Sequence, residues 1–278
     1  SLSLGGPLSN WAMTVTHGLW GLKPWQWLFV IEGLPTVLLA GVVLKFLPGR
    51  PAEAAWLSAE EKEWLQSRLE YEASSIRRRH GLVGLAALRD GRVLALSFIY
   101  FANITSVLGI AIFLPRIIEG MGASATEANL IATLPFLAGI AGVLFFGWLA
   151  DVWKLHRKGL LFLTLLISAA GLAGAGYIGP SYAALALIAS ANFGIYGVKA
   201  PFWPLPSMFL TGTAAAGGIA LINSVGNLGG FAGPFIVGFI RDHTHSYVIA
   251  LYVLAGFTAS AALVTALLKT PSMVEEEP

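Results

Sequence analysis

Long apolar runs joined by short polar links make up most of the chain. The runs cover 24–47, 93–118, 126–150, 157–178, 181–208, 215–240 and 247–269. Each run reaches or exceeds the ~20 residues with which an α-helix crosses about 30 Å of hydrocarbon. Apolar residues fill these runs without alternating with polar ones, so we expect helices and no strands. Links this short favour antiparallel neighbours in a bundle. The pattern predicts an all-α, polytopic membrane protein.

The first 47 residues are expected to hold part of one span and then a complete one. Residues 1–22 are half apolar and rich in glycine, and they start without Met or a basic leader, so we expect no signal peptide and a truncated product. Trp25 and Trp27 stand at the start of the complete span as an interfacial belt. Lys45 can snorkel at its end, and Pro48 stops the helix.

The composition changes to charged and polar over 48–92. Ser58 followed by Glu61 is typical of a capping box that opens a helix. An apolar stripe follows at helical spacing, formed by Trp56, Leu57, Trp64, Leu65 and Leu69. The segment therefore predicts an amphipathic helix that lies along the membrane surface or against a bundle.

Composition supports the membrane assignment. Of 278 residues, 56% are hydrophobic and 12% are charged, with a mean hydropathy of +0.73. A soluble domain carries about twice that charged fraction. The net charge of +2 says little about partners. The absence of cysteine excludes disulfides and thiolate chemistry, and we expect no cofactor.

The basic residues predict an orientation. If 48–92 lies on one side of the membrane, alternation of the spans places Lys154, Arg157, Lys158 and Lys269 on that side too. The opposite side keeps Lys23, Arg116 and Arg241. Cytoplasmic loops carry the excess of Lys and Arg, so the long segment and the C-terminus are expected in the cytoplasm, in a plasma (inner) membrane. The expected regions are 1–47, the cytoplasmic loop 48–92, a six-helix bundle over 93–269 and a cytoplasmic tail, 270–278.

One loop carries a recognisable motif. Gly147 is followed by Asp151, and then by Arg157 and Lys158 across the turn between two spans. An ordinary loop obeying the positive-inside rule would give much of this pattern. The string resembles the signature of the major facilitator superfamily, although Val152 stands where that family has a basic residue.

Three further segments resemble the anion:cation symporter branch of this family, in order and spacing. They are WQWLFVIEGLP at Trp25–Pro35, the loop sequence at Arg50–Glu72 and FWPLPSMFLTGTAAAGGIALINSVGNLGGFAGP at Phe202–Pro234. The resemblance implies the C-terminal six-helix bundle of a major facilitator fold, preceded by one span and part of another. It also implies that the N-terminal half, with most of the coupling acids and anion-binding arginines, is missing. The branch moves organic anions such as hexuronates, tartrate and phthalate, usually with a cation and commonly with a proton.

Polar residues inside the apolar runs are the candidates for substrate contact. Asn223 and Asn227 lie one turn apart on one helix, with Ser224 beside them. Their side chains could donate to a carboxylate, or they could serve helix packing beside several glycines. Asn103 lies in the middle of its span and has the same two interpretations.

Lys199 is the cation placed deepest within a span. It could attract an anion, or its long stem could snorkel to the interface. Phe202 and Trp203 follow it between prolines, so we expect the helix to break there and to expose backbone to a cavity.

The sequence thus predicts secondary transport of a small organic anion by alternating access, within a lipid bilayer and without nucleic acid. The alternative is a membrane subunit with a structural or assembly role. An enzyme is disfavoured, because no paired acids, His cluster or nucleophile lies at a common depth. His243 and His245 are expected in a solvated loop rather than at a metal.

Overall fold

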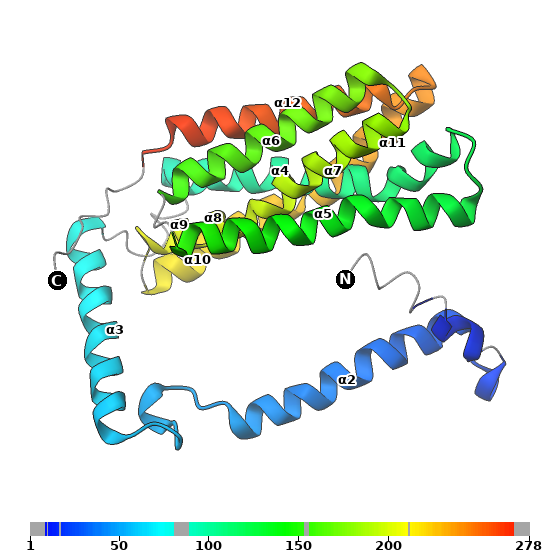
Figure 1. The fold of residues 1–278 in the computed structure, drawn as a ribbon. Helices are drawn as coiled ribbons and strands as arrows, with labels where there is room; N and C mark the ends of the chain where they lie inside the picture. Colours follow the sequence, from blue (N-terminus) through cyan, green and yellow to red (C-terminus); the bar gives the residue numbers. More distant parts are fainter. Residues whose placement is uncertain are drawn as a thin grey trace. The chain divides into compact units, whose positions relative to one another are not determined.

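The protein is described by a computed structural model that covers residues 9, 11–16, 18–80, 89–152, 156–210 and 212–269, with backbone alone at 72–73, 75–80 and 212–213. Helices account for nearly all of this part of the chain (Figure 1). Lys154 and the tail 270–278 lie outside the described residues. The chain divides into two compact units, one up to Ser75 and one from Ile76 onward.

The first unit contains a long apolar helix and most of a polar one. Helix α2 runs from Pro24 to Phe46, and the backbone N–H of Lys23 at its start donates to Gln26 Oε1 at 2.8 Å. No residue of α2 is buried within the unit, which suits a helix surrounded by lipid or by other spans.

Helix α3, Ala59–His80, begins at the predicted capping box. The hydroxyl of Ser58 donates to Glu61 Oε2 at 2.9 Å, and Glu61 N donates back to the Ser58 hydroxyl oxygen at 3.2 Å. The backbone N–H of Ser58 also donates to Glu61 Oε2, at 2.8 Å, and this bond together with the one from the hydroxyl holds the pKa of Glu61 below its usual value. The sequence-based prediction of a helix opened by Ser58 is therefore confirmed.

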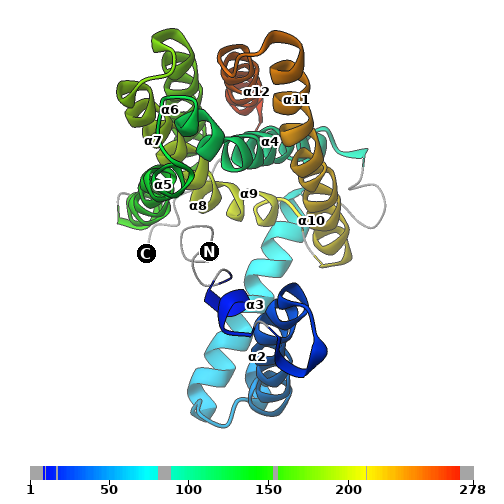
Figure 2. The same ribbon diagram turned by 90° about the vertical axis from the view of Figure 1, so that its right-hand side faces the viewer.

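The second unit holds the remaining helices in an antiparallel bundle. Their bounds are α4 Gly91–Glu119, α5 Ala125–Val152, α6 Arg157–Ile178, α7 Tyr182–Gly197, α8 Lys199–Phe202, α9 Pro204–Ser207, α10 Gly212–Asn227, α11 Gly229–Thr244 and α12 Val248–Leu267. Viewed near the helix axes, α5, α6 and α7 gather on one side, and α4, α11 and α12 gather on the other (Figure 2). Contacts between α6 and α12 and between α4 and α5 join the two groups.

Polar side chains fix where the long helices begin. Asp90 Oδ1 accepts from the backbone N–H of Arg92 at 2.7 Å and so caps α4. Ser124 and Glu127 form a second capping box at the start of α5. Ser181 accepts from Ala184 N at 3.2 Å and caps α7. Each cap satisfies backbone donors that a helix leaves unpaired at its N-terminus.

Small residues let the helices of each group approach closely. A side chain at Gly142 of α5 would collide with the backbone of Phe193 in α7. A Cβ at Gly171 of α6 would lie 2.7 Å from the backbone of Ala191, also in α7. On the other side, a Cβ at Gly233 of α11 would collide with the carbonyl of Thr105 in α4. Small residues at such contacts are how membrane helices gain van der Waals packing in the absence of a hydrophobic driving force.

Two spans are interrupted. The expected span 181–208 consists of α7, α8 and α9, because Pro201 and Pro204 lack the N–H groups that a continuous helix requires. The expected span 215–240 is divided after Asn227 and continues to Thr244. His243 therefore lies in the last turn of α11, and its assignment to a loop was wrong. Its ring lies tilted against the ring of Phe239, with centroids 4.1 Å apart.

Seven helical stretches among the described residues are long and apolar enough to cross a membrane: Pro24–Phe46, Gly91–Glu119, Ala125–Val152, Arg157–Ile178, Tyr182–Ser207, Ala214–Thr244 and Val248–Leu267. They coincide with the seven apolar runs of the sequence. The all-α polytopic fold is confirmed, whereas the division into cytoplasmic and membrane regions stays a prediction.

Candidate functional site

An aromatic cluster forms where α4 meets the interrupted span α7–α9. The ring of Tyr100 stacks on Phe202 with centroids 5.4 Å apart and meets Trp203 edge-on at 5.2 Å. Phe202 is fully buried, while Tyr100 and Trp203 are half-buried. The proline interruption gives this span the turn that brings two successive aromatic residues to one tyrosine.

Helix α10 reaches the same cluster through a glycine. A Cβ at Gly226 would overlap the ring of Tyr100, so α10 crosses α4 with its backbone against that ring. Tyr100 therefore touches both interrupted spans. Asn227, the next residue, ends α10.

Asn103 lies one turn further along α4 and is fully buried. Its Nδ2 donates to the carbonyl oxygen of Ile195 in α7 at 2.9 Å, so the side chain ties α4 to α7. The structure thus gives Asn103 a packing contact. Its predicted contact with substrate is neither supported nor excluded by this geometry and stays a prediction.

The interior of the bundle contains unpaired polar atoms. Asn103 Oδ1, Thr105 Oγ1, Asn192 Nδ2 and the Tyr196 hydroxyl are buried without a hydrogen-bond partner among the described residues. A buried polar group without a partner costs about 1–3 kcal/mol. Two of these groups come from α4 and two from α7. Thr105 Oγ1 faces Gly229 of α11, so the unpaired groups are spread over more than one helix contact.

Lys199 lies at the first residue of α8 and is exposed. Its Nζ stands over the ring of Tyr196, 5.1 Å from the centroid. This cation–π contact leaves the ammonium open to an anion from outside the bundle, because no carboxylate of the described residues pairs with it. The contact fits an anion attractor, and the exposure fits the snorkelling alternative equally well.

The amides of α10 face outward and are joined to each other. Asn227 Nδ2 donates to Asn223 Oδ1 at 2.6 Å and to the Asn223 carbonyl oxygen at 2.9 Å. Asn223, Ser224 and Asn227 are all exposed on the surface of the second unit. The pairing uses the donors of Asn227 and leaves Asn223 Nδ2 without a partner among the described residues. A carboxylate could accept a hydrogen bond from that donor.

The loop motif has a simple geometry. Gly147 is half-buried in α5, and a Cβ there would just reach Ala200 of α8 at 4.0 Å. Asp151 is exposed in the last turn of α5, and Arg157 and Lys158 are half-buried at the start of α6. Residues 153–155 between them lie outside the described part of the chain. A role of this motif in conformational change stays a prediction.

The structure therefore joins Phe202, Trp203 and Gly226 of α10 around Tyr100. It leaves the α10 amides exposed and buries Asn103. Sequence reasoning missed Tyr100, Asn192 and Tyr196. Asn192 carried a signal, since an amide inside an apolar run has the same pattern as Asn103. An aromatic residue in an apolar run has no such signal, because its contacts depend on how the helices pack against one another.

Comparison with known proteins places these features in a family. Residues 96–278 match the model of the Major Facilitator Superfamily. A putative tartrate transporter of Agrobacterium vitis is 39% identical over 99% of this chain and 61% of its own length. A quinolone resistance transporter of Acinetobacter baumannii is 36% identical over 92% of this chain and 58% of its own length. The chain thus spans about three-fifths of the length of these relatives.

A solved structure shows the same fold. The Escherichia coli fucose:proton symporter superposes with a TM-score of 0.60 and 14% sequence identity, over 89% of this chain and 68% of that one. At this identity the likeness concerns the fold alone. The family match extends over most of the chain. This chain belongs to the Major Facilitator Superfamily.

Proposed function

We propose that this chain forms one wall of the path of a secondary transporter for a small organic anion. The observation that carries the proposal is the exposed amide pair of α10, in which the Nδ2 donor of Asn223 has no partner among the described residues. Relatives named as putative tartrate transporters support a carboxylate as the substrate. Transport here involves no covalent step on the substrate.

In the proposed site, the Asn223 amide donates to a substrate carboxylate and Asn227 holds that amide in position. Lys199 attracts the anion, and Trp203 supplies an apolar edge beside Tyr100. Interrupted helices suit such a site, because transporter sites are typically built at breaks in membrane helices near the bilayer midplane. The experiment is uptake of radiolabelled tartrate by the transporter that contains this chain, reconstituted in proteoliposomes. Uptake that is lost in Asn223→Asp, at normal protein levels, would support the proposal.

We further propose that the opposite wall is a second six-helix half and that transport proceeds by alternating access. One bundle offers an exposed amide face, which by itself is a wall and no gated path. Residues 1–278 alone in proteoliposomes should show no saturable uptake, whereas addition of the other half should restore it. Saturable uptake by a monomer of residues 1–278 would overturn this part of the proposal.

Coupling to a cation, with the proton as first candidate, is the third element of the proposal. A proton-coupled transporter accumulates tartrate when the pH outside is below the pH inside, and an uncoupler abolishes the accumulation. A response to a sodium gradient in place of a pH gradient would replace the proton with sodium.

The orientation proposed from the basic residues places 48–92 and the C-terminus in the cytoplasm, with the protein in the inner membrane. The cations at the start of α6 belong to the same side. The alternative function is a membrane subunit with an assembly role, in which the α10 amides bind another helix. That alternative predicts that the complex with the partner forms at wild-type levels. It also predicts that addition of substrate does not change the solvent accessibility of α10.

A further inference from the structure

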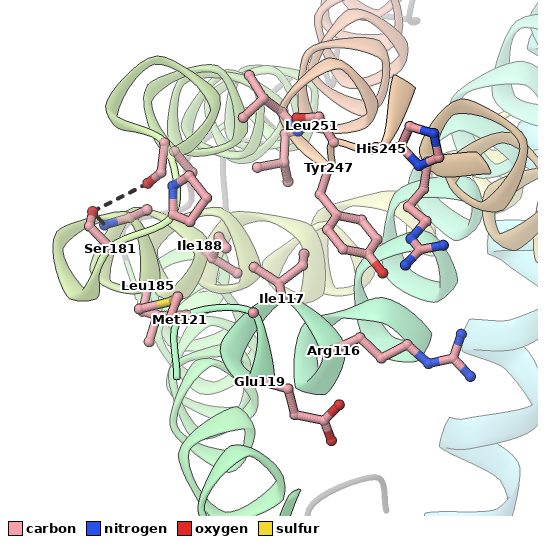
Figure 3. Close-up of a pocket in the computed structure, with 18 residues that line it drawn as sticks. Arg116, Ile117, Glu119, Met121, Ser181, Leu185, Ile188, His245, Tyr247 and Leu251 are labelled. Atoms are coloured by element: carbon pink, nitrogen blue, oxygen red, sulfur yellow. Dashed lines mark hydrogen bonds between the residues drawn. The ribbon is translucent and has the colours of Figure 1, made fainter. Parts of the chain in front are cut away.

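A cavity of about 490 Å³ opens at the end of the second unit where α4 and α11 finish and α7 and α12 begin (Figure 3). The end of α4 contributes Arg116 and Ile117, and the turn between α11 and α12 contributes His245 and Tyr247. This end is remote from the proposed transport site. Along α4, Arg116 stands 13 residues beyond Asn103, or about 20 Å by helical rise.

The lining of the cavity is divided into a basic part and an apolar part. Arg116 and Arg241 are both exposed and lie at its rim. Ile117, Ile188 and Leu251 line the inner part from three different helices. A surface of this kind offers a guanidinium for a negative head group and hydrocarbon for an apolar body.

The apolar part extends further into the bundle. A small second cavity is lined by Gly109, Val237 and Leu254, and it shares Ile117, Ile188, Tyr247 and Leu251 with the first. Its lining is apolar throughout, apart from the hydroxyl of Tyr247. This second cavity measures about 10 Å³ and lies between α4, α7, α11 and α12, next to the apolar part of the first.

Aromatic contacts hold the rim in shape. The Arg116 guanidinium lies 5.9 Å from the ring of Phe113, and that ring lies 5.9 Å from the ring of Tyr247. Figure 3 shows the Tyr247 ring reaching from the α11–α12 turn towards the end of α4 that carries Arg116. The turn itself is constrained, since His245 adopts a positive φ of 54°.

The acidic groups near the rim leave the two arginines available to bind an anion. Arg241 Nη1 lies 3.5 Å from Asp242 Oδ1, but the two side chains are 50% and 72% exposed, so solvent screens the pair. Glu119 also lines the cavity, and its carboxylate is directed away from Tyr247 in Figure 3. With two guanidinium groups against the one carboxylate of Glu119, the lining carries a net positive charge.

We propose that this cavity binds an amphiphilic anion, with its carboxylate or phosphate between Arg116 and Arg241 and its apolar chain against Ile117, Ile188 and Leu251. The ligand could be an anionic phospholipid of the adjacent leaflet or a free acid with a hydrocarbon tail. The chemistry is the same in both cases, and the experiment below distinguishes them. The site is separate from the proposed transport site and does not depend on it.

Because the natural chain has no cysteine, one introduced thiol can report on the cavity. Met121→Cys places a thiol in the lining, and Thr126→Cys places one on the exposed start of α5 at the same end of the bundle, outside the lining. Each variant is placed in phosphatidylcholine nanodiscs, and its rate of modification by a maleimide is measured. The additions are dodecanoate, uncharged dodecanol and acetate, and in a separate arm phosphatidylglycerol replaces part of the phosphatidylcholine.

We expect dodecanoate or phosphatidylglycerol to slow modification at position 121 and to leave position 126 unaffected. Protection by phosphatidylglycerol alone assigns the site to lipid, and protection by dodecanoate assigns it to a free acid. Arg116→Gln with Arg241→Gln should raise the half-protecting concentration about 10-fold or more, since charge-assisted hydrogen bonds are lost. Arg50→Gln with Lys269→Gln removes the same charge elsewhere and should leave protection intact.

Three results would overturn the proposal. The first is equal protection by dodecanol, which would remove the role of the anion, and the second is equal protection by acetate, which would remove the role of the chain. The third is protection that survives in the double Arg→Gln variant. A variant with Lys at both arginine positions keeps the charge and should retain most of the protection, so it separates loss of binding from loss of fold.

Discussion

Gly226 of α10 lies against the ring of Tyr100 in α4 so closely that a Cβ at position 226 would overlap the ring. The same ring stacks on Phe202 and touches Trp203. One tyrosine of α4 thus contacts both α10 and the interrupted span α7–α9, and it sets the separation of these three spans. A small residue at a helix crossing commonly serves such close approach in membranes.

Gly226→Ala should destabilise the bundle. The added methyl forces Tyr100 or α10 to move, and overpacking of this kind costs about 1–3 kcal/mol. The measurement is the midpoint of unfolding in mixed micelles, followed by circular dichroism. Gly256→Ala is the matched control, because a Cβ there meets nothing within 4 Å and alanine favours a helix over glycine. Equal midpoints for the two variants would show that the Gly226–Tyr100 contact is not tight.

The helices were predictable from sequence for a physical reason. A span in lipid must be apolar over its whole length, so α2, α4, α5, α6 and α12 were visible as uninterrupted runs. The break after Trp203 was predictable as well, because proline removes backbone donors. The break after Asn227 was not, since Gly229 and Gly230 permit a joint without requiring one.

The site was predictable in part. Asn223 and Asn227 were identifiable because a polar side chain in an apolar run is costly and needs a partner. Whether that partner lies inside or outside the bundle depends on which face of the helix packs against its neighbours. The apolar pattern around Asn103 and around the α10 amides is the same, so the sequence does not distinguish the two cases. Placement of the helices resolves it: Asn103 is buried against Ile195, and the α10 amides are exposed.

Asn103→Leu distinguishes a packing role from a substrate role. Loss of the bond to the Ile195 carbonyl should lower the free energy of unfolding by about 1 kcal/mol, the usual net value for such a bond. If packing is its whole role, the apparent affinity for tartrate stays unchanged in the complete transporter. A fall of 10-fold or more in that affinity, with normal stability, would show that Asn103 contacts the substrate.

The cap of α4 should give a measurable pH dependence. The Arg92 side chain, which donates to Asp90 at 3.0 and 2.9 Å, holds the pKa of that carboxyl below its usual value. A lowered pKa stabilises the fold at pH values above the normal carboxyl pKa, and this stabilisation is lost as the pH falls through the lowered value.

The stability difference between the natural chain and Asp90→Asn should therefore be constant from pH 8 to 5 and shrink below about pH 4. Asparagine retains the capping function, so the variant isolates the charge. The measurement is the unfolding midpoint of both proteins across this pH range. A difference that does not change with pH would show that the Asp90–Arg92 pair contributes no stability.

Thiol labelling tests the orientation. Ser67→Cys, exposed on α3, should resist an impermeant maleimide in intact cells and react after permeabilisation. Thr126→Cys, exposed at the start of α5 and separated from α3 in the sequence by the single span α4, should react without permeabilisation. The reverse pattern would invert the orientation derived from the basic residues.

Transport kinetics distinguish the two roles considered for Lys199. If its ammonium faces the anion path, Lys199→Ala raises the apparent substrate constant, and Lys199→Arg retains most of the activity. If it snorkels to the interface, both variants resemble the natural protein. The measurement is concentration-dependent uptake at two ionic strengths, since an attraction between exposed charges weakens as salt increases.

The most direct test of the central claim is the apparent tartrate constant of the complete transporter carrying Asn223→Ala. The Asn223 amide is the free donor of the pair, so its loss should cost about 1.5–3 kcal/mol, or roughly 10- to 150-fold in affinity, at normal protein levels. Asn227→Ala, which removes the group that positions it, should have a smaller effect in the same direction. Asn129→Ala removes an exposed amide of α5 and serves as the control. An unchanged constant in Asn223→Ala, with uptake intact, would contradict the assignment of this face to the substrate.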